Sequence, residues 1–115
     1  HQTGGWVKGL GLHVQGNNAV IDSSFIINNI KTDFGHNRYA AGIYLNGSSN
    51  RIQNTTITGN RITQDGTQYG DNLKGAGIYI TGSLSDTLVN NIISDNTSGG
   101  DCFGGGIKLW MEWAI

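Results

Sequence analysis

The chain repeats itself, and this repeat constrains the fold more than any other feature of the sequence. The stretch GIYLNGSSNRIQNTTITGN, Gly42 to Asn60, returns 35 residues later as GIYITGSLSDTLVNNIISDN, Gly77 to Asn96. Its opening block also occurs as GLHVQG from Gly11 and, in part, as GIKLW from Gly106. A period of this length indicates a repeat architecture, in which stacked units bury one continuous core.

A second block follows each full copy of the first. It consists of an aliphatic residue, a Ser or Asn two positions on, an Ile five on and an Asn eight on. Its three copies are Ile21, Ser23, Ile26 and Asn29, then Ile52, Asn54, Ile57 and Asn60, then Leu88, Asn90, Ile93 and Asn96. The segments between this block and the next glycine differ in length, so we expect large insertions at this place of the cycle only.

Corner residues recur at fixed places in the repeat. We expect Asn29, Asn60 and Asn96 to stack their amides in a ladder and to adopt the left-handed turn that a corner needs. The glycines at 16, 47 and 82 suit a turn with positive φ. The chain contains no proline, which would remove a hydrogen-bond donor from a strand.

Apolar residues alternate within the opening block, which is the period of a strand and not of a helix. Ile43 and Leu45 are therefore expected to face the interior, with Tyr44 and Asn46 facing away. Over all copies, the expected inward residues are Leu12, Val14, Ile43, Leu45, Ile78, Ile80, Ile107 and Leu109. Stacking such strands about 4.8 Å apart predicts an all-β solenoid of three coils and a partial fourth.

The length of 115 residues allows one domain, 1–115. We place its repeats at about 11–41, 42–76 and 77–105, with a partial copy at 106–110. The apolar residues of 110–115 suggest a cap over the last coil, although Trp110 could instead contact a sugar or a partner. Nothing comparable precedes Leu12, so we expect this N-terminal end to pack against another β-helix segment or subunit.

These blocks resemble the coils of the right-handed parallel β-helix of the pectin lyase-like superfamily, over roughly residues 9 to 110. The resemblance implies the fold but no single activity, because the superfamily includes polysaccharide lyases, hydrolases, epimerases, phage tailspikes and adhesins. In these families, polysaccharide lies on the outer face of the strand that the opening block forms. A glycan groove on that face is therefore an expectation.

Two columns of outward residues would line such a groove. The first consists of His13, Tyr44, Tyr79 and Lys108, and the second of Gln15, Asn46, Thr81 and Trp110. Aromatic faces stack on sugar rings, while polar side chains bind hydroxyls or a uronate. Our candidate ligand-binding residues are His13, Tyr44, Tyr79, Lys108, Asn46, Trp110 and Arg38. The alternative is that Tyr44 and Tyr79 are simply tyrosines favoured on strands.

Catalytic residues are less clearly marked. Asp71 and Asp101 occupy similar places in successive cycles and could form the carboxylate pair of a glycoside hydrolase. A lyase or epimerase would need a base and a cation, for which His36 and Lys74 are candidates. Polygalacturonase-type signatures are absent, so whether the chain is an enzyme stays open. We expect no cofactor. Calcium is the one metal left open, because Asp65, Asp71 or Asp101 could bind it although they lie in no calcium-binding motif.

The charge balance narrows the classes of partner. Seven basic residues against eight acidic ones, without a basic cluster, favour neither nucleic acid nor an anionic membrane. No apolar run approaches the roughly 18 residues of a membrane span. The single cysteine, Cys102, permits no disulfide within the chain and leaves the redox compartment open.

The sequence therefore predicts a polysaccharide-binding module of an extracellular, cell-surface or virion-surface protein, and leaves open whether it also processes the polysaccharide. The alternative is a noncatalytic structural stalk or fibre subunit that stacks end to end with other β-helix chains.

Overall fold

The computed structural model describes residues 7–8, 10–31, 38–62, 73–74, 76–82, 85–98, 102–103 and 106–109. These residues form seventeen β-strands and no helix, so no membrane-spanning helix occurs among them. All pairings between the strands are parallel. The prediction of an all-β chain built from short strands is confirmed for this part of the molecule.

The chain visits five sheets in one fixed order, and we call each visit to all five a pass. The first pass contains β1 (Val7–Lys8), β2 (Leu12–Gln15), β3 (Val20–Asp22), β4 (Phe25–Ile27) and β5 (Ile30–Lys31). The second contains β6 (Arg38–Tyr39), β7 (Ile43–Asn46), β8 (Arg51–Gln53), β9 (Thr56–Thr58) and β10 (Arg61–Ile62). The third contains β11 (Leu73–Lys74), β12 (Ile78–Thr81), β13 (Thr87–Val89), β14 (Ile92–Ser94) and β15 (Thr97–Ser98). A fourth, incomplete pass contains β16 (Cys102–Phe103) and β17 (Ile107–Leu109).

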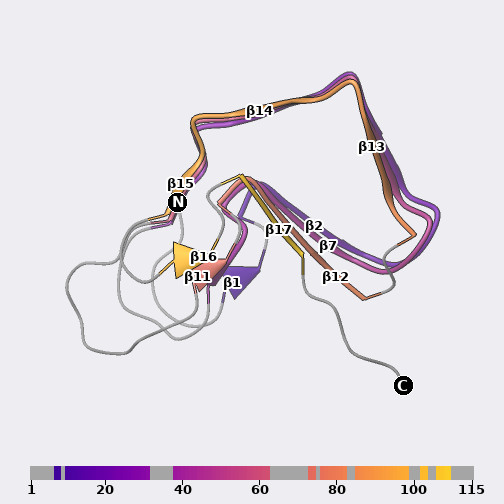
Figure 1. Cartoon of the computed structure of the whole chain (residues 1–115), viewed down its shortest axis with the longest axis horizontal. Coiled ribbons are helices and arrows are strands. Elements are labelled where there is room, and N and C mark those ends of the chain that lie inside the picture. Colours follow the sequence, from indigo (N-terminus) through magenta and orange to yellow (C-terminus); the bar gives the residue numbers. More distant parts are fainter. Residues whose placement is uncertain are drawn as a thin grey trace.

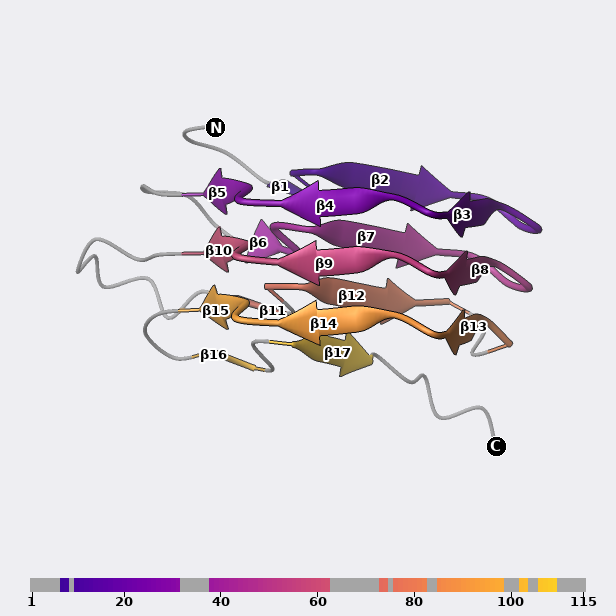
Figure 2. The same ribbon diagram turned by 90° about the horizontal axis from the view of Figure 1, so that it is seen from above.

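Each sheet collects one strand from every pass, and we name it after its first strand. The β1 and β2 sheets have four strands, in the orders β1-β6-β11-β16 and β2-β7-β12-β17. The β3, β4 and β5 sheets have three strands each. Strands of one sheet overlie one another in Figure 1, and Figure 2 shows the passes as successive layers. This stack of parallel strands is compatible with a parallel β-helix.

Aliphatic side chains from the β2, β3 and β4 sheets fill the interior. The buried core consists of Ile43, Leu45, Ile52, Ile57, Ile78 and Ile80, all from the second and third passes. Leu12 and Val14 pack against this core from the first pass and are partly buried. Ile107 and Leu109 continue the same columns but are 41% and 48% exposed, because the described residues place no β3-sheet or β4-sheet strand at their level.

Most of the difference in length between passes falls where the sequence predicted it, between the β5 sheet and the next β1-sheet strand. The structure adds a second, smaller difference. Asn46 pairs with Thr81 but Arg51 pairs with Thr87, so the turn 82–86 is one residue longer than the turn 47–50. The expectation of a single place for length changes was therefore incomplete.

The expected asparagine ladder is present. Asn29 Nδ2 donates to Asn60 Oδ1, and Asn60 Nδ2 donates to Asn96 Oδ1, both at 2.9 Å. Asn60 is completely buried. The left-handed residue, however, is the one before each ladder residue: Asn28, Gly59 and Asp95 have φ of 56°, 67° and 53°. The ladder asparagines therefore close the corner without making the left-handed turn, which corrects the sequence-based assignment.

Two further corners have the same construction. Between the β2 and β3 sheets, the Ala19 amide donates to Asn50 Oδ1 and the Asn50 amide donates to Asp86 Oδ1. Between the β3 and β4 sheets, the ladder residues are Ser24, Thr55 and Asn91. The three corners thus obey one five-residue pattern: a ladder residue, an inward aliphatic residue two positions on, and the next ladder residue five positions on.

The glycine directly before β2, β7 and β12 lies against the asparagine ladder. A Cβ built on Gly42 would lie 2.3 Å from the Gly77 carbonyl oxygen and 3.2 Å from Asn60 Nδ2. A Cβ on Gly77 would lie 2.4 Å from the Gly106 carbonyl oxygen and 2.9 Å from Asn96 Nδ2. The two sequence blocks therefore meet across the interior, and glycine leaves room for this contact.

Candidate functional site

The outer face of the β2 sheet carries the predicted aromatic column. The His13 and Tyr44 rings are perpendicular to each other at a centroid distance of 4.9 Å, and Tyr44 stacks on Tyr79 at 5.4 Å. Strand pairing places Lys108 next to Tyr79 in the same row. Such ring pairs contribute about 0.5 to 1.5 kcal/mol beyond the area they bury. The column predicted from the alternating pattern is therefore present as a row of neighbours.

The two tyrosines are not open to solvent. Tyr44 is 6% and Tyr79 is 4% exposed, and both form a small buried cluster with Ala40. Ala40 has a φ of 54°, so it lies in the left-handed region at the bend between β6 and β7. This burial differs from the expectation of an exposed sugar platform. The alternation of residues along the strand predicted their direction but not what covers them.

Polar residues of the predicted groove remain accessible at the first pass. His13 and Gln15 on β2 are exposed, whereas Asn46 on β7 is half-buried. Lys108 lies on β17 of the same sheet, whereas Arg38 and Lys74 lie on β6 and β11 of the neighbouring β1 sheet. Trp110 and the catalytic candidates His36, Asp71 and Asp101 lie outside the described residues, as does Asp65. The structure therefore does not bring a catalytic pair together within its described part, nor does that part hold a cluster of three His, Cys, Asp or Glu side chains.

Asp22 is the centre of an exposed polar cluster on the outer face of the β3 sheet. Its carboxylate accepts hydrogen bonds from Gln53 Nε2 at 2.9 Å, Asn54 Nδ2 at 3.1 Å and Ser23 Oγ at 3.0 Å. These bonds favour the charged form and lower the pKa of Asp22, with Gln53 contributing most. The cluster joins the first two passes across the surface.

The bond from Gln53 to Asp22 can be tested by titration. Replacing Gln53 with alanine is expected to raise the pKa of Asp22 toward its ordinary value, measured by NMR of the carboxyl carbon. Because the folded-state pKa lies below the unfolded one, this contact stabilises the fold above the unfolded pKa and is lost as the pH falls through the folded pKa. Gln15→Ala is the control. If the titration midpoint of Asp22 is unchanged in Gln53→Ala, the hydrogen bond from Gln53 does not lower the pKa of Asp22.

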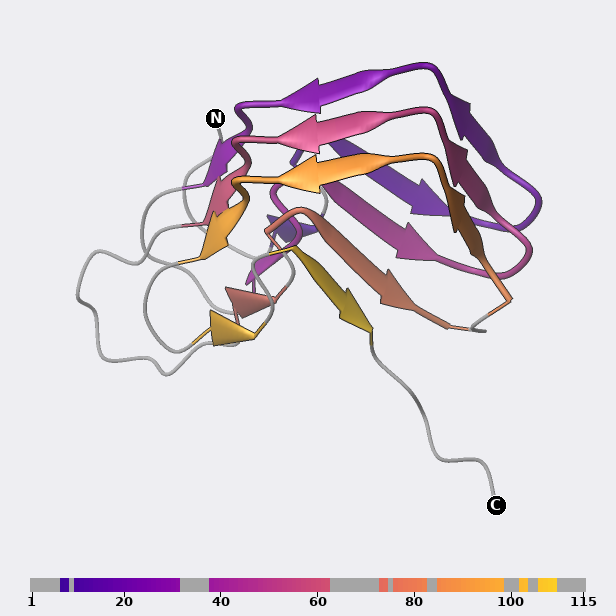
Figure 3. The same cartoon turned by 45° about the horizontal axis from the view of Figure 1, so that its top comes forward.

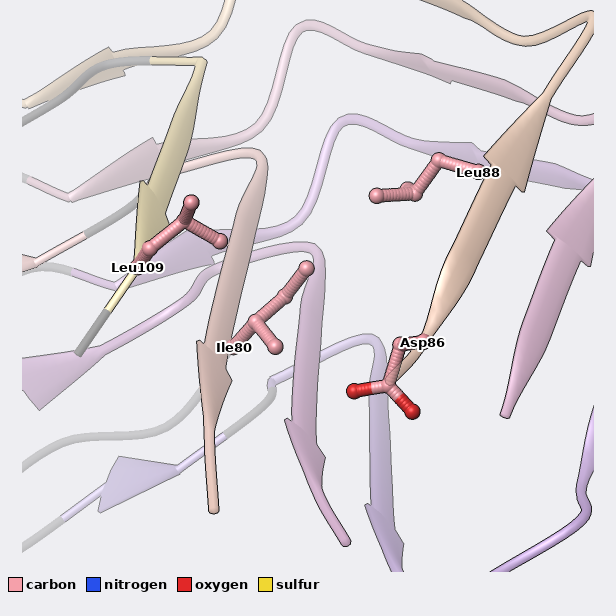
Figure 4. Close-up of a pocket in the computed structure, with 4 residues that line it drawn as sticks. All are labelled: Ile80, Asp86, Leu88 and Leu109. Carbon is pink, nitrogen blue, oxygen red and sulfur yellow. The ribbon is translucent and has the colours of Figure 1, made fainter. Parts of the chain in front are cut away.

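A pocket of about 160 Å³ lies at the C-terminal end of the stack. It is lined by Ile80, Asp86, Leu88 and Leu109, and Figure 4 shows Leu88 and Leu109 pointing toward each other from β13 and β17. Asp86 Oδ1 accepts the Asn50 amide, but Oδ2 is buried with no hydrogen-bond partner among the described residues. Sequence reasoning missed Asp86, although its place five residues before Asn91 and ten before Asn96 marks it as a ladder residue.

The unpaired oxygen of Asp86 follows from its neighbours' geometry. Asn91 and Asn96 each donate Nδ2 to a carbonyl 39 residues earlier, those of Ile52 and Ile57. By the same spacing, a side-chain amide at position 86 would donate to the carbonyl of Gly47. A carboxylate oxygen cannot donate to that carbonyl, whereas Asn50 Nδ2 does donate to the equivalent Gly16 carbonyl at 3.0 Å.

Asp86→Asn is therefore expected to raise the free energy of unfolding by roughly 1 to 3 kcal/mol, the usual cost of a buried polar group without a partner. Urea denaturation of both proteins measures this difference. The reverse change, Asn50→Asp, places the same mismatch one pass earlier and is expected to lower the free energy. An Asp86→Asn variant no more stable than the parent would show that Oδ2 does not face an acceptor.

Comparisons with known proteins add no further information on the site. The chain matches no protein-family model, and searches of curated proteins and of solved structures found no match.

Proposed function

We propose that this chain is a segment of a right-handed parallel β-helix solenoid, similar to those of the pectin lyase-like superfamily, and that it serves as a noncatalytic structural stalk or fibre segment. Three features support the solenoid: the fixed order of the five sheets, the uniformly parallel pairing and the side-chain ladders at three corners. Figure 3 shows how successive passes follow the same path.

The observation that carries the structural role is the burial of Tyr44 and Tyr79. Rings that are packed on each other and covered stabilise the outer face of the β2 sheet and are not available for stacking on a sugar. The ends of the stack are less well covered than its middle, since Leu12 and Val14 are only partly buried and Leu109 is 48% exposed. Partly covered ends suit stacking against other β-helix segments, including at the N-terminal end.

A glycan array tests this role. A structural segment is expected to bind no glycan saturably, while the double variant Tyr44→Ala, Tyr79→Ala is expected to melt at a lower temperature because it loses buried aromatic packing. Saturable glycan binding by the parent chain would contradict a purely structural role. Light scattering tests the stacking: association that increases with protein concentration is expected, and a concentration-independent monomer would contradict it.

Glycan binding by an extracellular or virion-surface protein is the second candidate. It is favoured by the exposure of His13 and Gln15 on the outer face of the β2 sheet, where both can reach sugar hydroxyls. The same array decides it, with His13→Ala and Gln15→Ala expected to lose the signal. Binding that both variants retain would place the glycan elsewhere on the molecule.

A further inference from the structure

The sequence contains three acceptor motifs for N-glycosylation, which have the form Asn-x-Ser or Asn-x-Thr. They begin at Asn46 (Asn-Gly-Ser), Asn54 (Asn-Thr-Thr) and Asn96 (Asn-Thr-Ser). In such a motif the side-chain amide of the asparagine takes the sugar, and the hydroxyl two positions on is part of the recognised sequence. Asparagine also recurs in this chain for structural reasons, so the surroundings of the three asparagines decide which of them can carry a glycan.

Asn96 belongs to the asparagine ladder. Its Oδ1 accepts from the backbone and side chain of Asn60, and its Nδ2 donates to the Ile57 carbonyl at 2.8 Å. A Cβ built on Gly77 would lie 2.9 Å from the same Nδ2, so this nitrogen has no room for a sugar on that side. A glycan on Asn96 would break the corner, and the folded chain therefore cannot carry one there.

Asn46 is half-buried at the end of β7. It lies between Gln15 of the preceding pass and Thr81 of the following pass. Its side chain packs against the turn of the third pass, since a Cβ built on Gly82 would lie 2.9 Å from Asn46 Oδ1. The amide is therefore held between neighbouring passes, which makes Asn46 a poorer acceptor than a fully exposed asparagine.

Asn54 is exposed at the corner between β8 and β9. Its Nδ2 donates to Asp22 Oδ1 at 3.1 Å, and among the described residues its second amide hydrogen has no acceptor. N-glycosylation replaces one hydrogen of the amide by C1 of a sugar and keeps the other. The hydrogen bond to Asp22 can therefore remain in the glycosylated protein.

The fold needs the backbone conformation of Asn54 and not its side chain. Ser23, Asn54 and Asn90 occupy the same place in three passes and have φ of 50°, 51° and 53°. Asparagine tolerates this left-handed conformation well, but Ser23 shows that the corner also accepts a different side chain. The side chain of Asn54 is therefore available for a modification, in contrast to that of a ladder asparagine.

The second pass alone combines an asparagine at this corner with a hydroxyl two positions on. The outward residues that begin β4, β9 and β14 are Phe25, Thr56 and Ile92, so Asn90 lacks the motif. Phe25 and Ile92 are 75% and 61% exposed on either side of Thr56. A bulky, hydrated glycan beside this apolar row would limit its association with other molecules.

We propose that Asn54 is an N-glycan acceptor. The reaction joins Asn54 Nδ2 to C1 of an oligosaccharide that is carried on a lipid diphosphate. The C1–O bond to the carrier breaks, the lipid diphosphate leaves, and one amide proton passes to a base. A transferase of the secretory route catalyses this step, so the proposal implies that the chain enters a secretory compartment. It does not rest on the structural role above, because a stalk segment and a glycan-binding module can both be glycosylated.

The test is expression of the whole chain behind a secretion signal in a eukaryotic cell, followed by digestion with trypsin and mass spectrometry. Cleavage after lysine and arginine puts each motif on a peptide of its own, 39–51, 52–61 and 75–108. The secreted chain is expected to carry a glycan on peptide 52–61, which peptide-N-glycosidase removes, and none on peptide 75–108. Translation in the presence of microsomes gives the same measurement on peptide 52–61 for a chain that is not secreted.

Two substitutions of Thr56 form a matched pair. Thr56→Val removes the hydroxyl with little change of shape and is expected to abolish the glycan on peptide 52–61, whereas Thr56→Ser keeps both the motif and the glycan. Asn54→Ser gives this corner the residue that Ser23 provides in the first pass, and its circular dichroism is expected to show the β-structure of the parent.

A peptide 52–61 without glycan in both the secreted chain and the microsomal product would overturn the proposal. So would a glycan that Thr56→Val retains. A glycan on peptide 75–108 of a secreted chain with the parent's β-structure would overturn the argument that the ladder excludes Asn96, and with it the choice of Asn54.

Discussion

Replacing Asn60 with alanine is expected to lower the free energy of unfolding by about 3 to 5 kcal/mol. Asn60 is fully buried, and its side chain bonds to both neighbouring passes. Its Oδ1 accepts from the backbone and side chain of Asn29, and its Nδ2 donates to Asn96 Oδ1 and to the Ile26 carbonyl. Alanine removes these bonds and leaves polar groups without partners in a narrow interior.

The control is Asn17→Ala, which also removes an asparagine that joins the first two passes. Asn17 Oδ1 accepts from the backbone and hydroxyl of Ser48, but in an exposed position where water can replace it. A loss of less than about 1 kcal/mol is therefore expected for Asn17→Ala. Urea denaturation measures both changes, and equal losses would show that the buried ladder does not close the corner as described.

The second large effect is expected from Gly42→Ala. The new Cβ would lie 2.3 Å from the backbone oxygen of Gly77, and a backbone atom cannot move aside without separating β7 from β12. These two strands pair through four residues in the middle of the stack. We expect a loss of roughly 3 kcal/mol or more, at the upper end of the cost of overpacking.

Gly106→Ala is the matched comparison, because Gly106 occupies the same place in the fourth pass. A Cβ there would have its nearest neighbour, Ile93 Cγ2, at 4.0 Å, which is ordinary contact. The thermal midpoint of Gly106→Ala is expected to stay close to that of the parent protein, whereas the thermal midpoint of Gly42→Ala is expected to fall by several degrees or more. Similar midpoints for the two variants would mean that the glycine column is not tightly packed.

The sequence was sufficient to predict the strands and the asparagine ladder because both depend on local rules that recur in every copy. Alternation determines which side of a strand faces the interior, and Ile43, Leu45, Ile78 and Ile80 are buried as it predicts. An asparagine that recurs at one place in each copy stacks on its own equivalents. Such features repeat with the sequence and can be found by aligning the copies.

The candidate site was harder to predict because it depends on what lies outside each pass. The sequence correctly aligned Tyr44 and Tyr79, but their exposure depends on the residues that cover the β2 sheet. The ladders that include Ala19 and Ser24 were missed because their members differ in residue type between copies, although their spacing from the asparagine ladder is the same in each copy. Asp86 is recognised as a mismatch only after Asn50 is seen to donate at the corresponding place.

The unequal lengths of the passes have a consequence for protein engineering. Equivalent ladder residues are 31 positions apart between the first two passes and 36 apart between the next two, yet β4, β9 and β14 pair without slipping. The cost of closing a longer loop grows only with the logarithm of its length. Foreign peptides, such as epitopes or affinity tags, are therefore expected to be tolerated between β10 and β11. Copies presented from successive passes would be held about 4.8 Å apart at their bases, as a closely spaced array along one edge.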